Sequence, residues 1–430
     1  MRDGKQKREL KTIPKDLQFY KFSAYGFLKN LRFFEPFLIL FFLEMGINYV
    51  QIGVLMAIRE ITTNLLELPT GMVADSFGRR ISMIFSFLSY IGSFLVFTFF
   101  PGFYLYMIAM LLFSAGEAFR TGTHKAMILS YLEIKGITDL KVHYYGHTRS
   151  ASQLGSALSS LIAMALVFYH GSFRWVFLAS IVPYIMELFL MFSYPRELDG
   201  HIKPMTRGMG KEIKERFSST ARDFLSLSRK WSTLTALLSS AVFSGLFKGV
   251  KDYLQPLVKK YAAALPFLLY LSADRRSTIL IGVTYFFLFL LTSYASKKSG
   301  PFADRVRHLP SGINITFIVG SLFLVLSGLA LKLELFELSI FFFIMLYIMQ
   351  SLRKPLNVGY ISEQISNRIM ATGLSGESQL SAIFSAFFSF LMGVLVQYAG
   401  LSAAVIIIAF ISLLMYPVVR IRCNGSSHSA

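Results

Sequence analysis

The sequence predicts an all-α membrane protein with twelve transmembrane helices in two pseudo-symmetric halves of six. Composition is the first reason: of 430 residues, 54% are hydrophobic and 16% are charged, whereas soluble domains have about 45–50% apolar and about 25% charged residues. Patterning is the second reason, because the apolar residues gather into runs of about 20, the length that crosses a bilayer as a helix. The same composition excludes a disordered or disulfide-rich secreted protein.

Twelve apolar runs have the required length, and short polar or charged stretches separate them. The fourth, the seventh and the tenth are the least regular of these runs, because charged residues interrupt them. We predict spans at residues 28–46, 50–73, 81–100, 104–131, 150–168, 175–192, 232–257, 278–296, 313–331, 335–358, 372–396 and 402–419.

One long polar connection falls midway along the chain and divides the twelve runs into two sets of six. This linker is rich in Lys and Arg, and it either lies as an amphipathic helix on the anionic inner leaflet or is a solvated connection. The predicted organisation is a basic N-terminal segment at 1–27, a first half at 28–194, the linker at 195–231, a second half at 232–420 and a tail at 421–430.

The positive charge of the chain predicts its orientation. The net charge is +19, and the basic residues lie between the apolar runs. If both termini are cytoplasmic, 32 Lys and Arg residues fall on the inner side and six on the outer side, as the positive-inside rule requires. We therefore expect a multi-pass protein of the plasma or inner membrane with the lipid bilayer, and no nucleic acid, as its partner.

Polar residues recur between the two halves at a nearly constant offset. Gly71 and Asp75 recur after 229 residues, the basic pair at His124 recurs after the same interval, and Ser152 recurs after 226. Such an offset at equivalent places in the topology indicates a duplicated six-helix unit. The matching residues of the second half are Gly300, Asp304, Arg353, Lys354 and Ser378.

The junction between the second and third runs carries a conspicuous motif. It consists of Gly71, Asp75, Gly78, Arg79 and Arg80, in the pattern G-x-x-x-D-x-x-G-R-[KR]. This resembles the signature loop of the major facilitator superfamily, which lies in a cytoplasmic loop after the second helix. The resemblance in topology covers essentially the whole chain, and it implies alternating access between two six-helix halves.

In that superfamily the loop is a conformational latch, and the resemblance implies the same role here. Asp75 would then lie against the N-terminus of the run at 372–396, where the helix dipole favours a carboxylate. Arg79 and Arg80 would pair with acidic groups at neighbouring helix ends, with Glu133 as a candidate. The alternative is a charged turn that follows the positive-inside rule.

Two departures disfavour one branch of the superfamily. Many of its drug–proton antiporters have a Gly-Pro signature in the fifth helix, but the run at 150–168 has no proline. Their fourth helix places a glycine four residues after an arginine, whereas here Gly122 follows Arg120 after two residues. These differences weaken, but do not remove, the similarity to drug antiporters.

Charged residues inside the fourth run predict a functional cavity, because a charge at mid-bilayer costs about 2.5–3.5 kcal/mol on insertion scales. Glu117, Arg120 and His124 are spaced to share one helix face, and Lys125 follows directly. We predict that Glu117 and His124 carry protons and that Arg120 and Lys125 contact the solute. The alternative is a Glu117–Arg120 ion pair with only a structural role.

The second, seventh and tenth runs contain further candidates. Glu60 and Glu67 share a helix face and either couple protons or form a structural pair. Lys248, Lys251 and Asp252 either bind an anionic group or form a cluster at the outer interface. Arg353, near the inner end of its run, either contacts the solute or anchors the helix at the membrane surface.

These observations predict a secondary active transporter, with the solute and protons as its small partners. Since the sequence has no nucleotide-binding loop, nucleophile motif, metal-ligand spacing or cysteine cluster, we expect no cofactor, no metal and no enzymatic activity. The excess of Lys and Arg in the charged runs favours a small organic anion, and the intramembrane acids favour proton coupling. One alternative is a proton-driven multidrug exporter, and another is a non-transporting sensor or scaffold. We expect the protein to function as a monomer.

Overall fold

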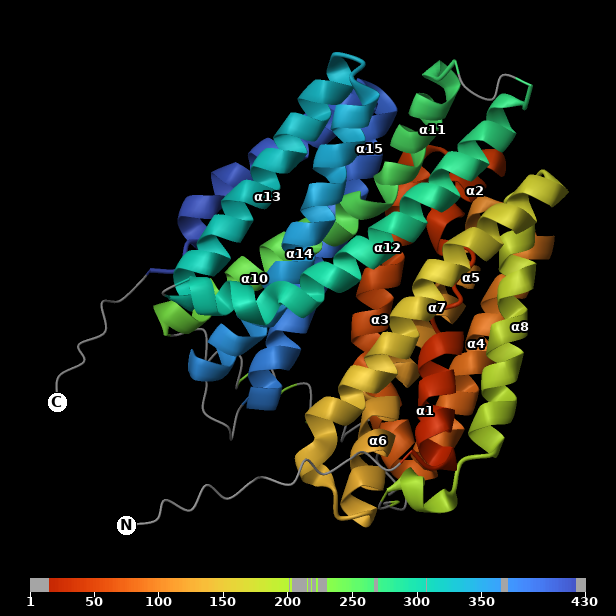
Figure 1. Ribbon diagram of the computed structural model, residues 1–430, viewed down its shortest axis with the longest axis vertical. Helices are drawn as coiled ribbons and strands as arrows, with labels where there is room; N and C mark the ends of the chain where they lie inside the picture. Colours follow the sequence, from red (N-terminus) through yellow and green to blue (C-terminus); the bar gives the residue numbers. More distant parts are fainter. Residues whose placement is uncertain are drawn as a thin grey trace, which may run out of the picture.

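The computed structural model describes residues 15–200, 202, 215, 218, 222, 230–266, 270–306, 308–364 and 370–422. These residues form helices and no strand, which confirms the all-α prediction for the described part of the chain. Two bundles lie side by side, an N-terminal half from α1 to α8 and a C-terminal half from α10 to α15 (Figure 1). Most of the predicted linker and tail, and residues 1–14, lie outside the described residues.

The N-terminal half contains eight α-helices and three short 3₁₀ turns among its described residues. They are α1 (Leu17–Leu28), η1 (Glu35–Phe37), α2 (Leu38–Glu44), α3 (Tyr49–Phe77), α4 (Arg79–Phe99), α5 (Phe103–Arg120), α6 (Thr123–Ile134), η2 (Thr138–Leu140), α7 (Lys141–His170), α8 (Trp175–Phe192) and η3 (Arg196–Asp199). The C-terminal half contains α10 (Trp231–Val250), η4 (Lys251–Tyr253), α11 (Leu254–Ala264), α12 (Ala273–Arg305), α13 (Leu309–Lys332), α14 (Phe336–Gln364) and α15 (Met370–Val419).

All twelve predicted runs lie largely on helical residues. Nine helical stretches among the described residues are long and apolar enough to cross a membrane. One of them, Gly373–Val419, contains the last two predicted runs, which meet at the non-helical Gly400. The first two runs fall below the criterion because η1 and α2 are short and α3 carries charges.

The first helix begins earlier than predicted. α1 starts at Leu17, where Asp16 caps the helix by accepting a hydrogen bond from the Phe19 amide at 2.9 Å. Phe22 is fully buried among aromatic rings of the N-terminal half. Residues 17–27 therefore belong to the bundle and not to a basic N-terminal segment, because α1 packs on α7 and α8. The prediction began the first run too late because Lys21 interrupts the apolar pattern.

Three of the membrane helices are broken. The first break, residues 29–34 and η1, separates α1 from α2. The second, η4, separates α10 from α11, and the third, Thr121 and Gly122, separates α5 from α6. Gly122 has φ +80°, a conformation that favours glycine. Irregular backbone at membrane depth is tolerated only where it is buried in protein or lines a cavity, so these breaks indicate where a polar interior lies.

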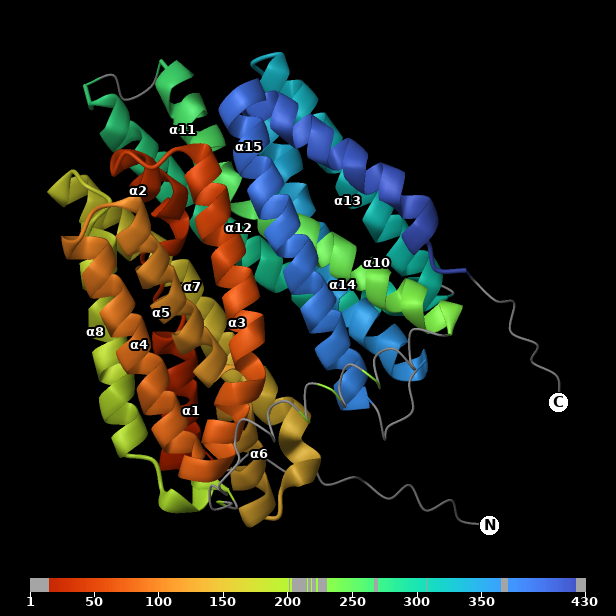
Figure 2. The same ribbon diagram turned by 180° about the vertical axis from the view of Figure 1, so that it is seen from behind.

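The two halves are in close contact at the end of the bundle that carries α2 and α11 (Figure 2). There α3 packs on α15 so closely that a Cβ atom on Gly53 would lie 2.8 Å from the Ser389 carbonyl oxygen. Gln255 of α11 joins the halves, since its side chain accepts from the Ile39 amide at 2.8 Å and donates to the Glu35 carbonyl at 2.9 Å. This end of the bundle is closed.

We predict that Gly53→Ala lowers the free energy of unfolding by about 1–3 kcal/mol, because the added methyl group overpacks a backbone–backbone contact. The matched control is Gly92→Ala in α4, where a Cβ would meet only Leu112 at an ordinary 3.7 Å and alanine favours the helix. Thermal unfolding of the detergent-purified variants measures both. Equal melting temperatures for the two variants would contradict the close packing of α3 on α15.

Candidate functional site

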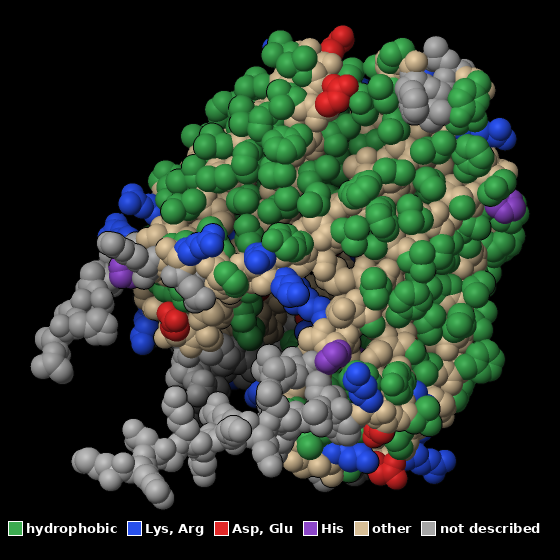
Figure 3. Space-filling model, viewed as in Figure 1, with side chains coloured by type: hydrophobic (Ala, Val, Ile, Leu, Met, Phe, Trp, Pro, Cys, Tyr) green, Lys and Arg blue, Asp and Glu red, His purple; other side chains and the backbone are tan. Residues whose placement is uncertain are grey.

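A cavity of about 490 Å³ lies between the two halves. The surface is hollowed between the bundles, toward the end at which α6 lies, and Lys and Arg side chains surround the opening (Figure 3). The cavity is lined from the N-terminal half by Arg32, Phe34, Glu35, Leu38, Arg59, Glu60, Thr63, Asn64, Glu67, Phe113, Glu117 and Thr121, and from the C-terminal half by Lys248, Lys251, Asp252, Lys354, Ser378 and Ala382. Two of the three helix breaks meet here at Glu35 and Lys251.

The charges of this lining are balanced. Among the described residues, five are cations and five are carboxylates. The cations are Arg32, Arg59, Lys248, Lys251 and Lys354, and the carboxylates are Glu35, Glu60, Glu67, Glu117 and Asp252. The charged predicted runs contain more Lys and Arg than acidic residues, but the described lining of the cavity contains equal numbers of both.

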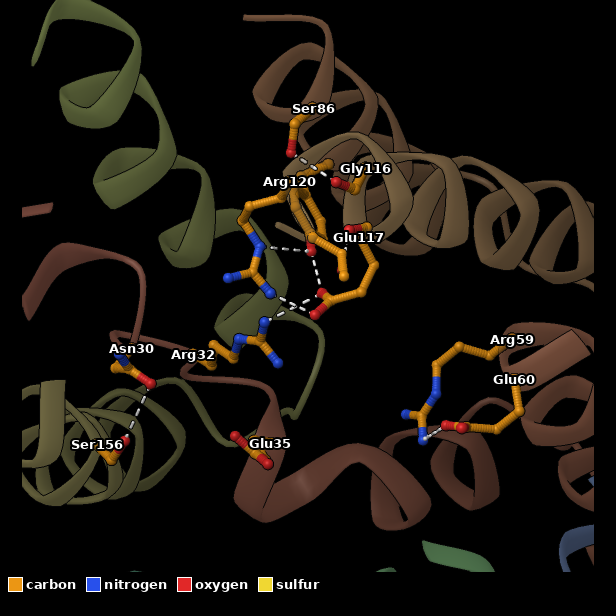
Figure 4. A network of polar contacts seen from close by, with 12 residues as sticks. Asn30, Arg32, Glu35, Arg59, Glu60, Ser86, Gly116, Glu117, Arg120 and Ser156 are labelled. Carbon is orange, nitrogen blue, oxygen red and sulfur yellow. Dashed lines mark hydrogen bonds and ion pairs between the residues drawn. The ribbon is translucent and has the colours of Figure 1, made fainter. Parts of the chain in front are cut away.

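Glu117 is the centre of a charge cluster in the N-terminal half (Figure 4). Its carboxylate pairs with Arg32 at 3.1 Å and with Arg120, and it accepts a hydrogen bond from the Tyr90 hydroxyl. Arg32 comes from the break after α1 and was not among the predicted site residues. A charged residue inside the predicted run at 28–46 was the available signal. The predicted Glu117–Arg120 pair is present, and a second guanidinium completes it.

Two further clusters join the halves across the cavity. Glu60 pairs with its neighbour Arg59 at 3.1 Å and with Lys248 of α10 at 2.8 Å. Lys251 pairs with Asp252 at 2.9 Å and with Glu35 of the opposite half at 3.6 Å. Four of the predicted site residues thus lie together on the cavity, and all four have partners of opposite charge.

Glu67 and Lys354 differ from the other charged lining residues. Glu67 belongs to α3 and Lys354 to α14, so each half contributes one of them. Neither side chain has an ion pair or a hydrogen bond within the described part of the chain. Lys248 acts electrostatically on Glu67, and Glu377 acts on Lys354, but neither group has a direct partner among the described residues.

Arg353 does not reach the cavity, which corrects its assignment as a solute-binding candidate. It is 0% exposed, and its guanidinium donates to the Ile313 carbonyl and to the carbonyl and hydroxyl oxygens of Ser239. The rings of Phe243 and Phe317 flank it at 5.0 and 5.3 Å. Arg353 holds α14 to α10 and α13 through carbonyl oxygens and ring faces.

His124 and Lys125 also lie outside the lining of the cavity. The break at Gly122 ends the helix face that His124 was predicted to share with Glu117 and Arg120. His124 is buried and stacks on the Tyr25 ring with the ring centroids 3.5 Å apart, while Lys125 is exposed. The shared-face prediction is therefore wrong for these two residues, because it assumed one continuous helix over 104–131.

The predicted gating motif covers the end of α3 and the start of α4, and Gly78, with φ +94°, separates the two helices. Arg80 pairs with Asp199 at 2.8 Å, and its amide also donates to that carboxylate at 2.9 Å. Arg79 donates to the Ala126 carbonyl at 3.1 Å and to the Ser130 hydroxyl at 2.7 Å. The acidic partner of the loop is thus Asp199 of η3 and not Glu133.

The other members of the motif, Gly71 and Asp75, are exposed on α3. Asp75 has no hydrogen bond or ion pair among the described residues, and its expected contact with the start of α15 stays a prediction. The side chains of Thr372 and of Asp304, the counterpart of Asp75, lie outside the described residues. The loop here ties α4 to α6 and η3 within one half.

Two helical halves around a charged cavity that is closed at one end define a membrane transporter. The sequence profile of the Major Facilitator Superfamily matches residues 30–374, and the chain therefore belongs to this family. It is accordingly an integral multi-pass membrane protein and a secondary transporter, and not an enzyme.

Similar proteins agree with this assignment. A 105-residue stretch is 30% identical to the uncharacterized MFS-type transporter YxaM of Bacillus subtilis (strain 168), and it spans 24% of this chain and 26% of that relative. A POT family transporter crystallised with 5-aminolevulinic acid has a TM-score of 0.73 at 12% identity, over 94% of this chain and 96% of the other. The nucleoside transporter NupG has a TM-score of 0.70 at 11% identity, over 94% and 98%. At these identities the structures show a common fold alone.

We predict that substitutions at two adjacent positions differ in their effect on stability: Arg353→Lys destabilises the protein, and Lys354→Met does not. Arg353→Lys should lower the free energy of unfolding by about 2–5 kcal/mol, because the single nitrogen of lysine cannot replace the two separated guanidinium nitrogens that donate to Ile313 and Ser239. Lys354→Met should leave stability within about 0.5 kcal/mol, since it removes no partner. Thermal unfolding in detergent measures both, and a stable Arg353→Lys variant would contradict the structural role of Arg353.

Proposed function

We propose that this protein is a proton-coupled secondary transporter of a small organic solute that carries both an anionic and a cationic group. The observation that supports this solute class is the pair of charged groups on the cavity, Glu67 and Lys354, that have no ion pair or side-chain hydrogen bond among the described residues. A solute whose carboxylate meets Lys354 and whose ammonium group meets Glu67 satisfies both charges at once through charge-assisted hydrogen bonds.

The anionic group of the solute is the part that the sequence analysis favoured. Three cations act electrostatically on Lys354, with Lys248 first, then Lys125 and Arg149, and Glu377 opposes them, so cations outnumber carboxylates around this residue and favour negative charge there. Deeper in the cavity, Lys248 and Lys251 already have carboxylate partners. A simple anion would use Lys354 but leave Glu67 unpaired, which is why we favour a solute with both charges.

Alternating access is the mechanism that fits a cavity closed at one end. If the charge bias gives the orientation, the end with α6 is cytoplasmic and the cavity is open to the cytoplasm in this conformation. Both halves of the cavity come from one chain, which supports function as a monomer. The predicted proton-coupling residues Glu60 and Glu67 lie on the cavity together with Glu117.

A multidrug exporter is the less favoured alternative. Its amphipathic substrates need an apolar surface, but of the described lining residues only Phe34, Leu38, Phe113 and Ala382 are apolar. Most of the remaining lining is charged, and desolvating these groups against an apolar compound is unfavourable.

We predict that zwitterions bind more tightly than simple anions or nucleosides. The probes are alanyl-alanine and 5-aminolevulinic acid as zwitterions, succinate as an anion, and uridine as a neutral solute. Each is tested by its effect on thermal unfolding of the purified protein, since a ligand at about 100 times its Kd stabilises the folded state by about 2.7 kcal/mol. Lys354→Met should remove the effect of both zwitterions, and Glu67→Gln should weaken it at least tenfold in Kd.

Lys332→Met is the matched control, because Lys332 is an exposed residue at the end of α13 that does not line the cavity. It should leave all affinities unchanged. A zwitterion that stabilises the Lys354→Met variant as strongly as the native protein would overturn the proposed solute site. Uptake of the bound zwitterion into proteoliposomes, driven by an imposed pH gradient, then tests proton coupling.

A further inference from the structure

A buried carboxyl group outside the cavity has no partner. Glu187 lies in the second half of α8, a helix with no other charged residue, and is 0% exposed. Neither carboxyl oxygen has a hydrogen-bond donor within the described part of the chain. Since an isolated buried carboxylate is strongly unfavourable, the local packing alone suits the protonated form of this group.

The electrostatic surroundings of Glu187 act in the opposite direction. Three cations act on it, with Arg120 first, then Lys29 and Arg32. They come from the end of α5 and from the break after α1. Positive charge stabilises an ionised carboxyl group, so the burial of Glu187 and the cations around it favour different protonation states.

The other titratable groups around Glu187 are tyrosines, Glu117 and His124, which stacks on Tyr25 and lies 3.2 Å from the Tyr194 hydroxyl. Tyr25 of α1, Tyr184 one turn earlier on α8, and Tyr194 beyond its end all interact electrostatically with Glu187. Glu117 competes with it for the same cations, because it pairs directly with Arg32 and Arg120. The cluster thus holds three cations and two carboxyl groups, and only one carboxyl group has hydrogen-bond partners.

We propose that Glu187 is the proton-binding group of the transport cycle, and that Arg120 and the break after α1 couple it to the cavity. In the conformation described, Glu187 is protonated and the two guanidinium groups are engaged by Glu117. When the break moves, Arg120 or Lys29 reaches Glu187, the carboxyl group ionises, and its proton passes to water in the cavity. This inference rests on the proposed proton-coupled function and assigns the proton to a residue that does not contact the solute.

The break after α1 can transmit such a change because its residues line the cavity and also act electrostatically on Glu187. Arg32 and Glu35 line the cavity, while Lys29 and Arg32 act on Glu187. Any displacement of the break that accompanies solute binding therefore alters the positive charge at Glu187. Glu117 is less suited to carry the proton, since it already accepts bonds from three donors.

The test begins with a readout that needs no solute. Infrared difference spectra of the purified full-length protein, between acidic and alkaline buffer, report the carbonyl stretch of protonated carboxyl groups. We expect a band that is lost in Glu187→Gln and kept in Glu44→Gln, whose exposed side chain accepts from the Phe173 amide at 2.9 Å. In Lys29→Met the midpoint of this band should move to higher pH by about one unit or more, because a cation is removed.

The transport readout uses alanyl-alanine in proteoliposomes. Glu187→Gln should retain exchange of labelled for unlabelled dipeptide at equal pH, and it should lose accumulation driven by a pH gradient at least tenfold. Accumulation by Glu187→Gln at the native level, or a native infrared spectrum in that variant, would overturn the inference. If the native protein shows the Glu187 band but neither exchanges nor accumulates the dipeptide, the proposed solute class fails while the proton site stands.

Lys29→Met also covers the case in which Glu187→Gln does not fold. It leaves the carboxyl group in place, and an unshifted midpoint in this variant would by itself contradict the proposed coupling through the break after α1.

Discussion

Charge compensation inside the membrane is the constraint on which this structure depends. A charge at that depth is tolerated when an opposite charge or aligned dipoles accompany it. Glu117 with its two arginines and Arg353 with its carbonyl oxygens and phenyl rings satisfy this condition in different ways. The first arrangement leaves a charged group beside the cavity, while the second is closed on all sides. Position within the bundle, and not the presence of charge, separates a functional site from a structural one.

Breaks in the helices supply the geometry that such compensation needs. The break after α1 brings Arg32 to Glu117, and η4 brings Lys251 to Glu35 of the opposite half. Each lies in the first membrane helix of its half, so the internal duplication inferred from the sequence is accompanied by irregular backbone at matching places in the topology. A continuous helix would satisfy its own backbone and would leave no such freedom for its side chains.

The sequence predicts the architecture well because hydrophobic length and positive charge are additive properties of a segment. The twelve runs follow from them, whereas the loop from Gly71 to Arg80 was identified by its resemblance to a family motif. Predictions that assumed regular helices failed, as for His124 beyond Gly122 and for the start of α1 at Leu17. Burial is also invisible to spacing, since Arg353 and Lys354 are neighbours in the sequence and only one faces the cavity.

The pairs that cross the cavity are arranged so that the halves can separate. Opening the closed end must break Glu60–Lys248 and Lys251–Glu35, which join the two halves. Glu60 keeps Arg59 and Lys251 keeps Asp252, each a partner in its own half. The members left alone are Lys248 and Glu35, whose side chains are already 42% and 32% exposed and can be hydrated. Separation therefore leaves no buried charge uncompensated, which lowers the barrier between the two states of the transporter.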